Sequence, residues 1–292
     1  MKLKKEGKTF SAIHNYVAAV KSFYKINDVI LNDSKLSKFM PEHKKSRKDR
    51  AYTHQEISKL LEVADDRMRV VILLLSSSGV RIGALPSLRL RNLEDNKLTV
   101  YENYRQEYFT FITPECKSAI DSYLDMRKRY GEKLDEDSYL IREQFDIRDP
   151  FAIQKPKQIT HRAIEWRLIS LAERCGIRIR EHETENRKYS SIRKDVPIAH
   201  GFRKFFTTQL IEADAKTELR WLLEGHNLKA NDSHYVRISE KRLQQEYEKA
   251  IDNLTIDPAN RLQRKVETLT IEKSRVDKLE EKIRRIEKMY QK

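Results

Sequence analysis

The sequence predicts a mainly helical α+β fold, with one small β-hairpin or sheet edge and a helical tail at the C-terminal end. Apolar residues recur at helical spacing through most of the 292 residues. The period changes to a pattern typical of β-strands only between residues 97 and 113. A heptad-like pattern begins at Leu262 and continues to the end of the chain. We therefore expect one helical domain with a small sheet, followed by a long helix.

Residues 1–50 form a basic N-terminal segment. Ile13, Val17, Val20 and Phe23 recur at helical spacing, which predicts one helix and leaves room for a second. This is too little apolar surface for a domain with its own core. The charged run at residues 43–50 is typical of a linker.

The next segment begins with a strong helix-start signal. Thr53 and Glu56 match a capping box, in which a hydroxyl and a carboxylate satisfy the free N–H groups of the first turn. Residues 68–77 are apolar nearly all round and predict a buried helix, and residues 78–85 are expected to start another. Residues 97–101 and 108–113 are rich in β-formers around a polar tip, which predicts a hairpin.

Helical spacing then returns. Pro114 fits the first turn of a helix and Gly131 lies just past its end. Residues 180–195 are highly charged and predict a long loop. The expected helices span residues 114–130, 160–175, 200–213, 217–224 and 239–251.

The tail predicts a coiled coil over residues 273–290, or alternatively a helix that packs onto its own domain. Lys265 and Glu272 interrupt the second apolar seam in its first half, whereas Leu279 and Ile286 complete it later. The first seam consists of residues seven apart, namely Leu262, Leu269, Val276, Ile283 and Tyr290.

Composition narrows the function. Lys and Arg number 59 against 45 Asp and Glu, and the net charge of +14 favours a polyanionic partner, nucleic acid first and an anionic membrane surface second. The sequence has no apolar stretch of roughly 18 residues and no signal peptide, so we expect a soluble, cytoplasmic protein without membrane contact.

Two distant cysteines exclude a disulfide framework and a cysteine zinc site. With seven glycines and no phosphate-binding glycine loop, we expect no cofactor and no metal.

Five residues form a constellation whose order is specific. Arg81 lies in a Gly-Val-Arg segment, His200 and Arg203 follow far downstream, His226 comes 23 residues after Arg203, and Tyr235 comes 9 residues after His226. Over roughly residues 51–252 this set resembles the tyrosine recombinase (integrase) family, especially its Xer-type and archaeal integrase-like members.

These residue types suit phosphodiester chemistry. Arg81 and Arg203 can each direct a guanidinium fork at phosphate oxygens. His200 lies one helical turn before Arg203 and shares its face of the helix. Tyr235 offers a phenol, which needs a base or cationic surroundings to react at neutral pH.

The resemblance implies a two-step transesterification. Tyr235 would attack the scissile phosphate, form a 3′-phosphotyrosyl link and release a 5′-hydroxyl, without ATP or metal. His200 would take part in proton transfer, and His226 would donate a hydrogen bond to the phosphate.

One position departs from the family pattern. Family members place a catalytic lysine in the hairpin after the first arginine, whereas the tip here, residues 104–108, contains no lysine. Arg105 is the nearest positional match, and Lys97 at the base of the hairpin is a weaker one. A guanidinium can hold charge but is a poor proton donor.

We therefore expect three parts, namely a truncated core-binding remnant with a basic linker (1–50), a tyrosine recombinase catalytic domain (51–252) and a helical tail (253–292). The expected function is site-specific recombination or integration of double-stranded DNA, with self-association on DNA into the tetramers typical of the family. The main alternative is a catalytically impaired DNA-binding or assembly protein that retains the fold. A type IB topoisomerase is a lesser variant.

Overall fold

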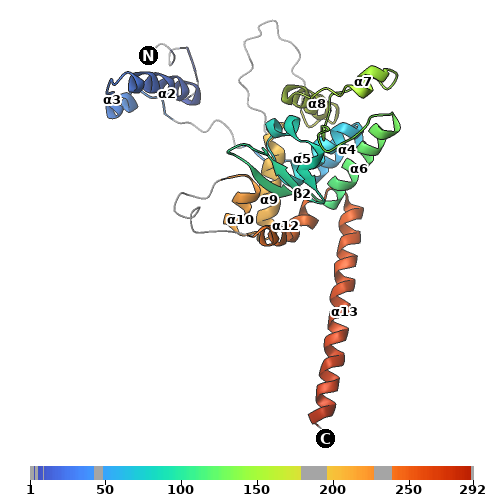
Figure 1. Cartoon of the computed structure of the whole chain (residues 1–292). Helices are drawn as coiled ribbons and strands as arrows, with labels where there is room; N and C mark the ends of the chain where they lie inside the picture. Colours follow the sequence, from blue (N-terminus) through green and yellow to red (C-terminus); the bar gives the residue numbers. More distant parts are fainter. Residues whose placement is uncertain are drawn as a thin grey trace. The chain divides into compact units, whose positions relative to one another are not determined.

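The computed structural model describes residues 3, 6–8, 10–42, 49–178, 196–226 and 239–290, the last six without their side chains. The chain divides into two compact units, Met1–Lys48 and Asp49–Lys292. The first unit contains helices α2 (Phe10–Ile26) and α3 (Asp33–Lys38), as Figure 1 shows. Ile13 is buried, whereas the large side chains of Phe23 and Ile26 are exposed. The one helix expected here is confirmed as α2, α3 takes the room left for a second, and the two helices enclose little apolar core.

The second unit begins with the predicted capping box. At the start of α4 (His54–Val63), the Thr53 hydroxyl accepts the Glu56 N–H, and the Glu56 carboxylate accepts the Thr53 N–H. Helix α5 (Asp66–Ser78) follows and is buried on nearly every side. It ends at Gly79, whose φ of 62° lies in the left-handed region. A Cβ atom there would also collide with the Phe206 ring, so the position requires glycine on two grounds.

The expected helix over residues 78–85 was wrong. After Gly79 the chain stays extended through Arg81 and then forms a short 3-10 helix, η1 (Ile82–Ser87), followed by η2 (Leu90–Asn92). Pro86 lies inside η1, and a proline cannot donate the hydrogen bond that would continue an α-helix. Arg81 consequently projects from an extended segment at the start of η1.

A small antiparallel sheet forms the β part of the fold. Its strands lie in the order β1 (Leu93–Glu94), β2 (Lys97–Val100) and β3 (Tyr108–Phe111). The predicted hairpin is the β2–β3 pair, in which Val100 faces Tyr108. The sequence did not predict β1, because two residues are too few to show an alternating pattern.

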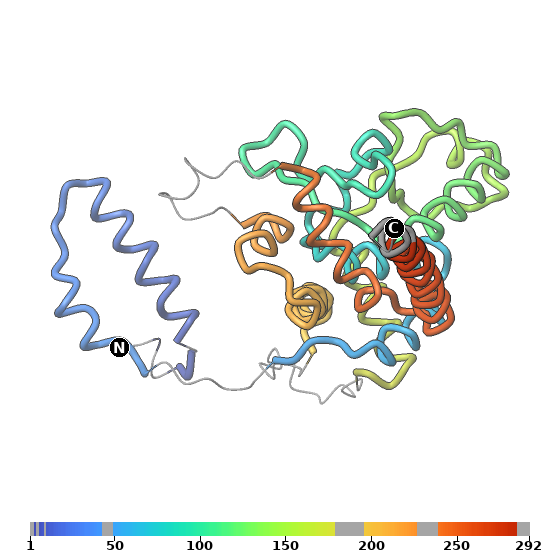
Figure 2. Tube along the Cα trace, turned by 90° about the horizontal axis from the view of Figure 1, so that it is seen from below, coloured from blue at the N-terminus to red at the C-terminus, as the bar shows by residue number. Residues whose placement is uncertain are grey.

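The remaining helices pack around α5. Helices α6 and α9 lie against it, and α12 runs beside α9 and α10 (Figure 2). On α9, the side chains of Phe202, Phe205 and Phe206 are almost fully buried and fix the helix to the core. The expected loop at residues 180–195 lies outside the described residues, and the short helix α7 was not predicted. The helices are α6 (Pro114–Arg129), α7 (Pro150–Gln154), α8 (His161–Arg174), α9 (His200–Glu212), α10 (Thr217–Leu223), α12 (Glu240–Leu254) and α13 (Pro258–Tyr290).

Helix α13 is fixed to the second unit at its beginning. The Glu115 carboxylate accepts the backbone N–H groups of Ile256 and Asp257, and Arg264 donates to Asp252 over 3.0 Å. Beyond this anchor the side chains described on α13 are exposed. Within the described part of the chain, no helix has the length and apolar character needed to cross a bilayer.

A buried charge cluster joins the end of α6 to the segment that follows it. Glu132 accepts hydrogen bonds from Arg127 (2.6 and 3.0 Å) and from Arg142 (2.7 Å), and all three side chains are almost fully buried. Burial acts to raise the pKa of the Glu132 carboxyl, but the two guanidiniums outweigh it and hold that pKa below its ordinary value. The carboxylate therefore stays ionised and neutralises charge inside the fold.

We expect Glu132→Gln to destabilise the fold by about 3–5 kcal/mol, because the variant leaves two buried guanidiniums without a counter-charge. Chemical denaturation with a helical signal measures the change. The matched control is Asp121→Asn, which removes a half-exposed carboxylate paired with Lys117 and should cost about 0–1 kcal/mol. Equal effects of the two substitutions would contradict a structural role for the buried cluster.

Candidate active site

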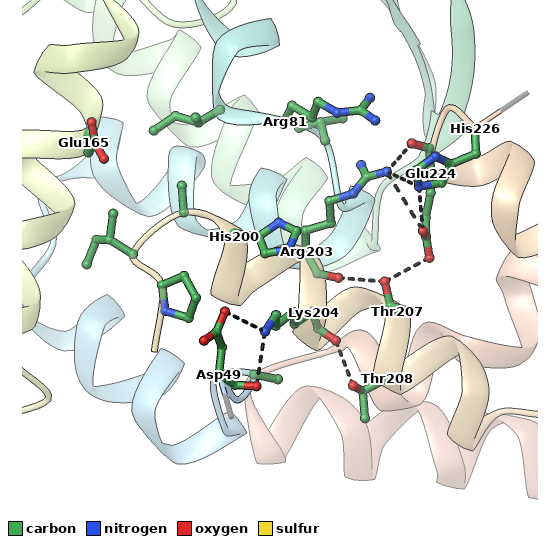
Figure 3. A pocket seen from close by; sticks show the side chains of 16 residues that line it. Asp49, Arg81, Glu165, His200, Arg203, Lys204, Thr207, Thr208, Glu224 and His226 are labelled. Carbon is green, nitrogen blue, oxygen red and sulfur yellow. Dashed lines mark hydrogen bonds and ion pairs between the residues drawn. The ribbon is translucent and has the colours of Figure 1, made fainter. Parts of the chain in front are cut away.

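A cavity of about 770 Å³ opens in the second unit between α9, the segment before η1, and the end of α10 (Figure 3). Four of the expected site residues line it, namely Arg81, His200, Arg203 and His226. They come from segments as far as 145 positions apart in the sequence, so the fold brings together what the motif order only suggested.

Each of the four is placed by the end of a secondary-structure element. Arg81 precedes η1, and its side chain is exposed. His200 is the first residue of α9, and Arg203 follows one turn later. His226 comes directly after α10 and after Gly225, whose φ is 68°. The two guanidiniums point to the same side of the cavity, toward His226 (Figure 3).

Arg203 is the most constrained of these residues. Only 7% of its surface is exposed, and its two terminal nitrogens donate to the carbonyl oxygens of Gly79 (2.6 Å) and Glu224. The second of these nitrogens also lies 3.1 Å from His226 Nε2. Burial and the charge of Arg81 lower the pKa of Arg203 from its ordinary value. Two cations thus lie close together in a site that is partly shielded from water.

Glu224 is a residue that sequence reasoning missed. Its carboxylate is buried, accepts the Thr207 hydroxyl at 2.9 Å, and lies 3.4 Å from His226 Nε2 and 3.9 Å from Arg203. Glu224 itself lines the cavity, so its carboxylate balances the positive charge there and orients both His226 and Arg203. In the sequence, its only signal is its position directly before Gly225 and His226.

Tyr108 is a second missed residue, at the first position of β3. Its ring packs against Gly225, where a Cβ atom would collide with it. Its hydroxyl is buried and lies beside the Arg203 guanidinium. Burial raises the pKa of this phenol, and the charges of Arg203 and Arg81 oppose the increase. The hairpin thus brings a hydroxyl to the two arginines.

His200 differs from His226 in its surroundings. Burial and the charges of Lys204 and Arg203 lower the pKa of His200 below its ordinary value of 6.5. Lys204 is held beside it by Asp49, with the ammonium 3.4 Å from that carboxylate. At neutral pH the His200 imidazole is therefore uncharged and able to accept a proton.

Of the two remaining expected residues, the structure describes only Arg105. Arg105 is exposed at the tip between β2 and β3 and does not line the cavity. Tyr235 lies outside the described residues. Lys97, the weaker alternative to Arg105, forms an ion pair with Glu240 at 2.7 Å. Where the structure describes the chain, no group of three or more His, Cys, Asp or Glu side chains is arranged to hold a metal ion.

We expect His200 to titrate below pH 6.5 in the folded protein, as measured by NMR of its ring signals. Lys204→Ala removes a neighbouring cation and should therefore move the titration midpoint upward. Lys249→Ala, which removes a lysine paired with Glu246, serves as the control and should leave the midpoint in place. A midpoint at or above 6.5 in the unmodified protein would contradict the proximity of these cations.

Two relatives found by sequence comparison are both named tyrosine recombinases. No protein-family model matches the sequence. The chain is 24% identical over 246 residues to tyrosine recombinase XerC of Leptospira interrogans. This match covers 80% of this chain and 70% of the relative. It is 24% identical over 267 residues to tyrosine recombinase XerA of Pyrococcus furiosus, which covers 87% of this chain and 79% of the relative.

A solved structure shows the same fold. The integrase of the transposon Tn1549, in complex with transposon right-end DNA, superposes with a TM-score of 0.57 at 19% identity. The match covers 85% of this chain and 81% of that integrase. The mainly helical fold with a small sheet is thus that of tyrosine recombinase catalytic domains, as expected from the sequence. The relatives and the shared fold together support the tyrosine recombinase family as the family of this chain.

Proposed function

We propose that this chain is a site-specific recombinase or integrase that breaks and rejoins double-stranded DNA through a 3′-phosphotyrosyl link to Tyr235. The observation that supports this most directly is the single cavity lined by Arg81, His200, Arg203 and His226. The net charge of +14 suits a DNA partner, and the Tn1549 integrase, which shares the fold, was solved in complex with DNA.

The two guanidiniums would bind the scissile phosphate. Arg81 is free to turn toward solvent, whereas the Gly79 and Glu224 carbonyls fix the plane of Arg203. Preorganised donors of this kind stabilise the negative charge that develops in the transition state, and one such donor is typically worth roughly 3–4 kcal/mol. His226, held by Glu224, would donate a further hydrogen bond to the phosphate.

Proton transfer would use His200. Its uncharged imidazole could take the proton of the Tyr235 phenol as the phenolic oxygen attacks phosphorus. The P–O5′ bond then breaks, and the released oxygen needs a proton to become a 5′-hydroxyl. One phosphodiester is exchanged for one phosphotyrosyl ester, so the step needs no ATP, and attack by a 5′-hydroxyl reverses it.

The alternative is a DNA-binding or assembly protein that retains the fold but turns over poorly. Three observations favour it. The hairpin tip contains no lysine, and Arg105 does not line the cavity. The ammonium of Lys97 is already paired with Glu240. The hairpin therefore offers no unpaired lysine that could protonate the 5′ oxygen when it leaves.

Tyr235→Phe should abolish the covalent protein–DNA adduct and leave duplex affinity nearly unchanged, because it removes only the attacking oxygen. The adduct is detected on a denaturing gel with a nicked suicide substrate, made from a duplex first selected for binding to this protein. Tyr130→Phe, at an exposed position after α6, should still form the adduct. An adduct that persists in Tyr235→Phe would place the nucleophile elsewhere. If the unmodified protein binds the duplex and forms none, the non-catalytic alternative holds.

Arg105→Ala should slow cleavage by roughly 10²-fold if its charge supports the leaving oxygen, while DNA binding changes little. Arg105→Lys tests the proton-donor deficit, because an ammonium can release a proton and a guanidinium cannot. Faster cleavage in Arg105→Lys would identify the native arginine as an impaired substitute. Arg129→Ala, an exposed arginine at the end of α6, is the control. No effect of either Arg105 change would remove it from the site and point to Lys97.

A further inference from the structure

Helix α13 exposes an apolar stripe that no described residue of its own unit covers. Val276, Leu279 and Ile283 expose 52%, 58% and 54% of their surfaces. They are spaced by three and then four residues, so they lie on one side of the helix. The sequence continues this spacing to Ile286 and Tyr290. A stripe this regular on a 33-residue helix matches the contact seam of a coiled coil.

The residue types at the seam favour two strands. In heptad notation Val276 and Ile283 occupy a positions, and Leu279 occupies the d position between them. β-branched residues at a combined with leucine at d favour a two-stranded parallel coiled coil, a preference that the Leu279 layer carries and that Ile286, at the next d, does not share. The preceding d positions in this register hold Lys265 and Glu272, so the continuous seam begins only after residue 272.

The charged residues beside the seam favour a parallel orientation of the two helices. Arg275 and Lys282 occupy g positions, whereas Glu280 occupies an e position and the sequence places Glu287 at the next e. In a parallel pair, each g residue faces the e residue five positions later on the other helix, which pairs Arg275 with Glu280 and Lys282 with Glu287. An antiparallel pair would instead bring g to g and e to e, and like charges would meet.

We propose that residues 273–290 of α13 bind the same segment of a second copy of this chain as a parallel, two-stranded coiled coil. The partner is a second copy because the seam is complementary to itself in both shape and charge. Val276 lies 18 residues after the start of α13, which corresponds to roughly 27 Å at 1.5 Å per residue. The contact therefore lies well away from the cavity and does not depend on DNA or on the proposed chemistry.

The first test is the oligomeric state of the full chain without DNA, measured by sedimentation across a dilution series. We expect a dimer that dissociates on dilution. Leu279→Glu should yield a monomer, because it buries a charge in the seam. Ile271→Glu is the matched control, since it introduces the same charge at an equally exposed apolar position of α13 that lies off the seam. It should leave the dimer intact.

The second test is charge exchange. Arg275→Glu combined with Lys282→Glu should weaken the dimer, because like charges then face each other across a parallel seam. Adding Glu280→Lys and Glu287→Lys should restore it. A chain that stays monomeric at its highest soluble concentration, an assembly larger than a dimer, or equal loss of association in Leu279→Glu and Ile271→Glu would each overturn the proposal. Charge exchange without effect would overturn the parallel orientation.

Discussion

The site depends on keeping two positive charges close together while one of them is buried. A buried guanidinium is costly unless acceptors surround it, and Arg203 meets this condition with the carbonyl oxygens of Gly79 and Glu224 and with the Glu224 carboxylate. These acceptors are the end of α5 and the end of α10, so the charge requirement fixes how both helices meet α9. The arrangement is permitted by two glycines, because side chains at Gly79 and Gly225 would collide with Phe206 and Tyr108.

The sequence predicted those features that depend on residues close together in the chain. The Thr53 capping box, the β2–β3 hairpin, and the position of His200 and Arg203 on one helix all follow from short-range spacing, and the structure confirms them. It did not predict Glu224 and Tyr108 as parts of the site, because burial of a polar side chain depends on partners distant in sequence. The 3-10 turn after Arg81 was missed for a local reason. Residues 78–85 have helical composition, but Pro86 prevents an α-helix from continuing through them.

The β2–β3 hairpin contains the position at which this sequence departs from the family pattern, because its tip has no lysine. The strands bring Tyr108 against Gly225 and beside Arg203, so the β2–β3 pair supports the site from the side although none of its residues lines the cavity. Lys97 is directed instead toward Glu240 and the Phe109 ring. In the proposed chemistry, phosphate binding would therefore be separable from donation of a proton to the leaving oxygen, because the cavity-lining arginines do not belong to the hairpin. A protein that retains the first without the second would still recognise its target.

The fixed plane of Arg203 has a stereochemical consequence. A guanidinium has five N–H donors, and the Gly79 and Glu224 carbonyls engage two of them, which prevents the group from rotating. The two non-bridging oxygens of a phosphodiester are not equivalent in a chiral strand, so a donor of fixed direction distinguishes between them. Replacing one or the other oxygen with sulfur creates two diastereomers that differ only in handedness at phosphorus. If Arg203 binds the scissile phosphate as proposed, its fixed direction would make the site sensitive to that handedness, whereas a freely rotating arginine would accept both.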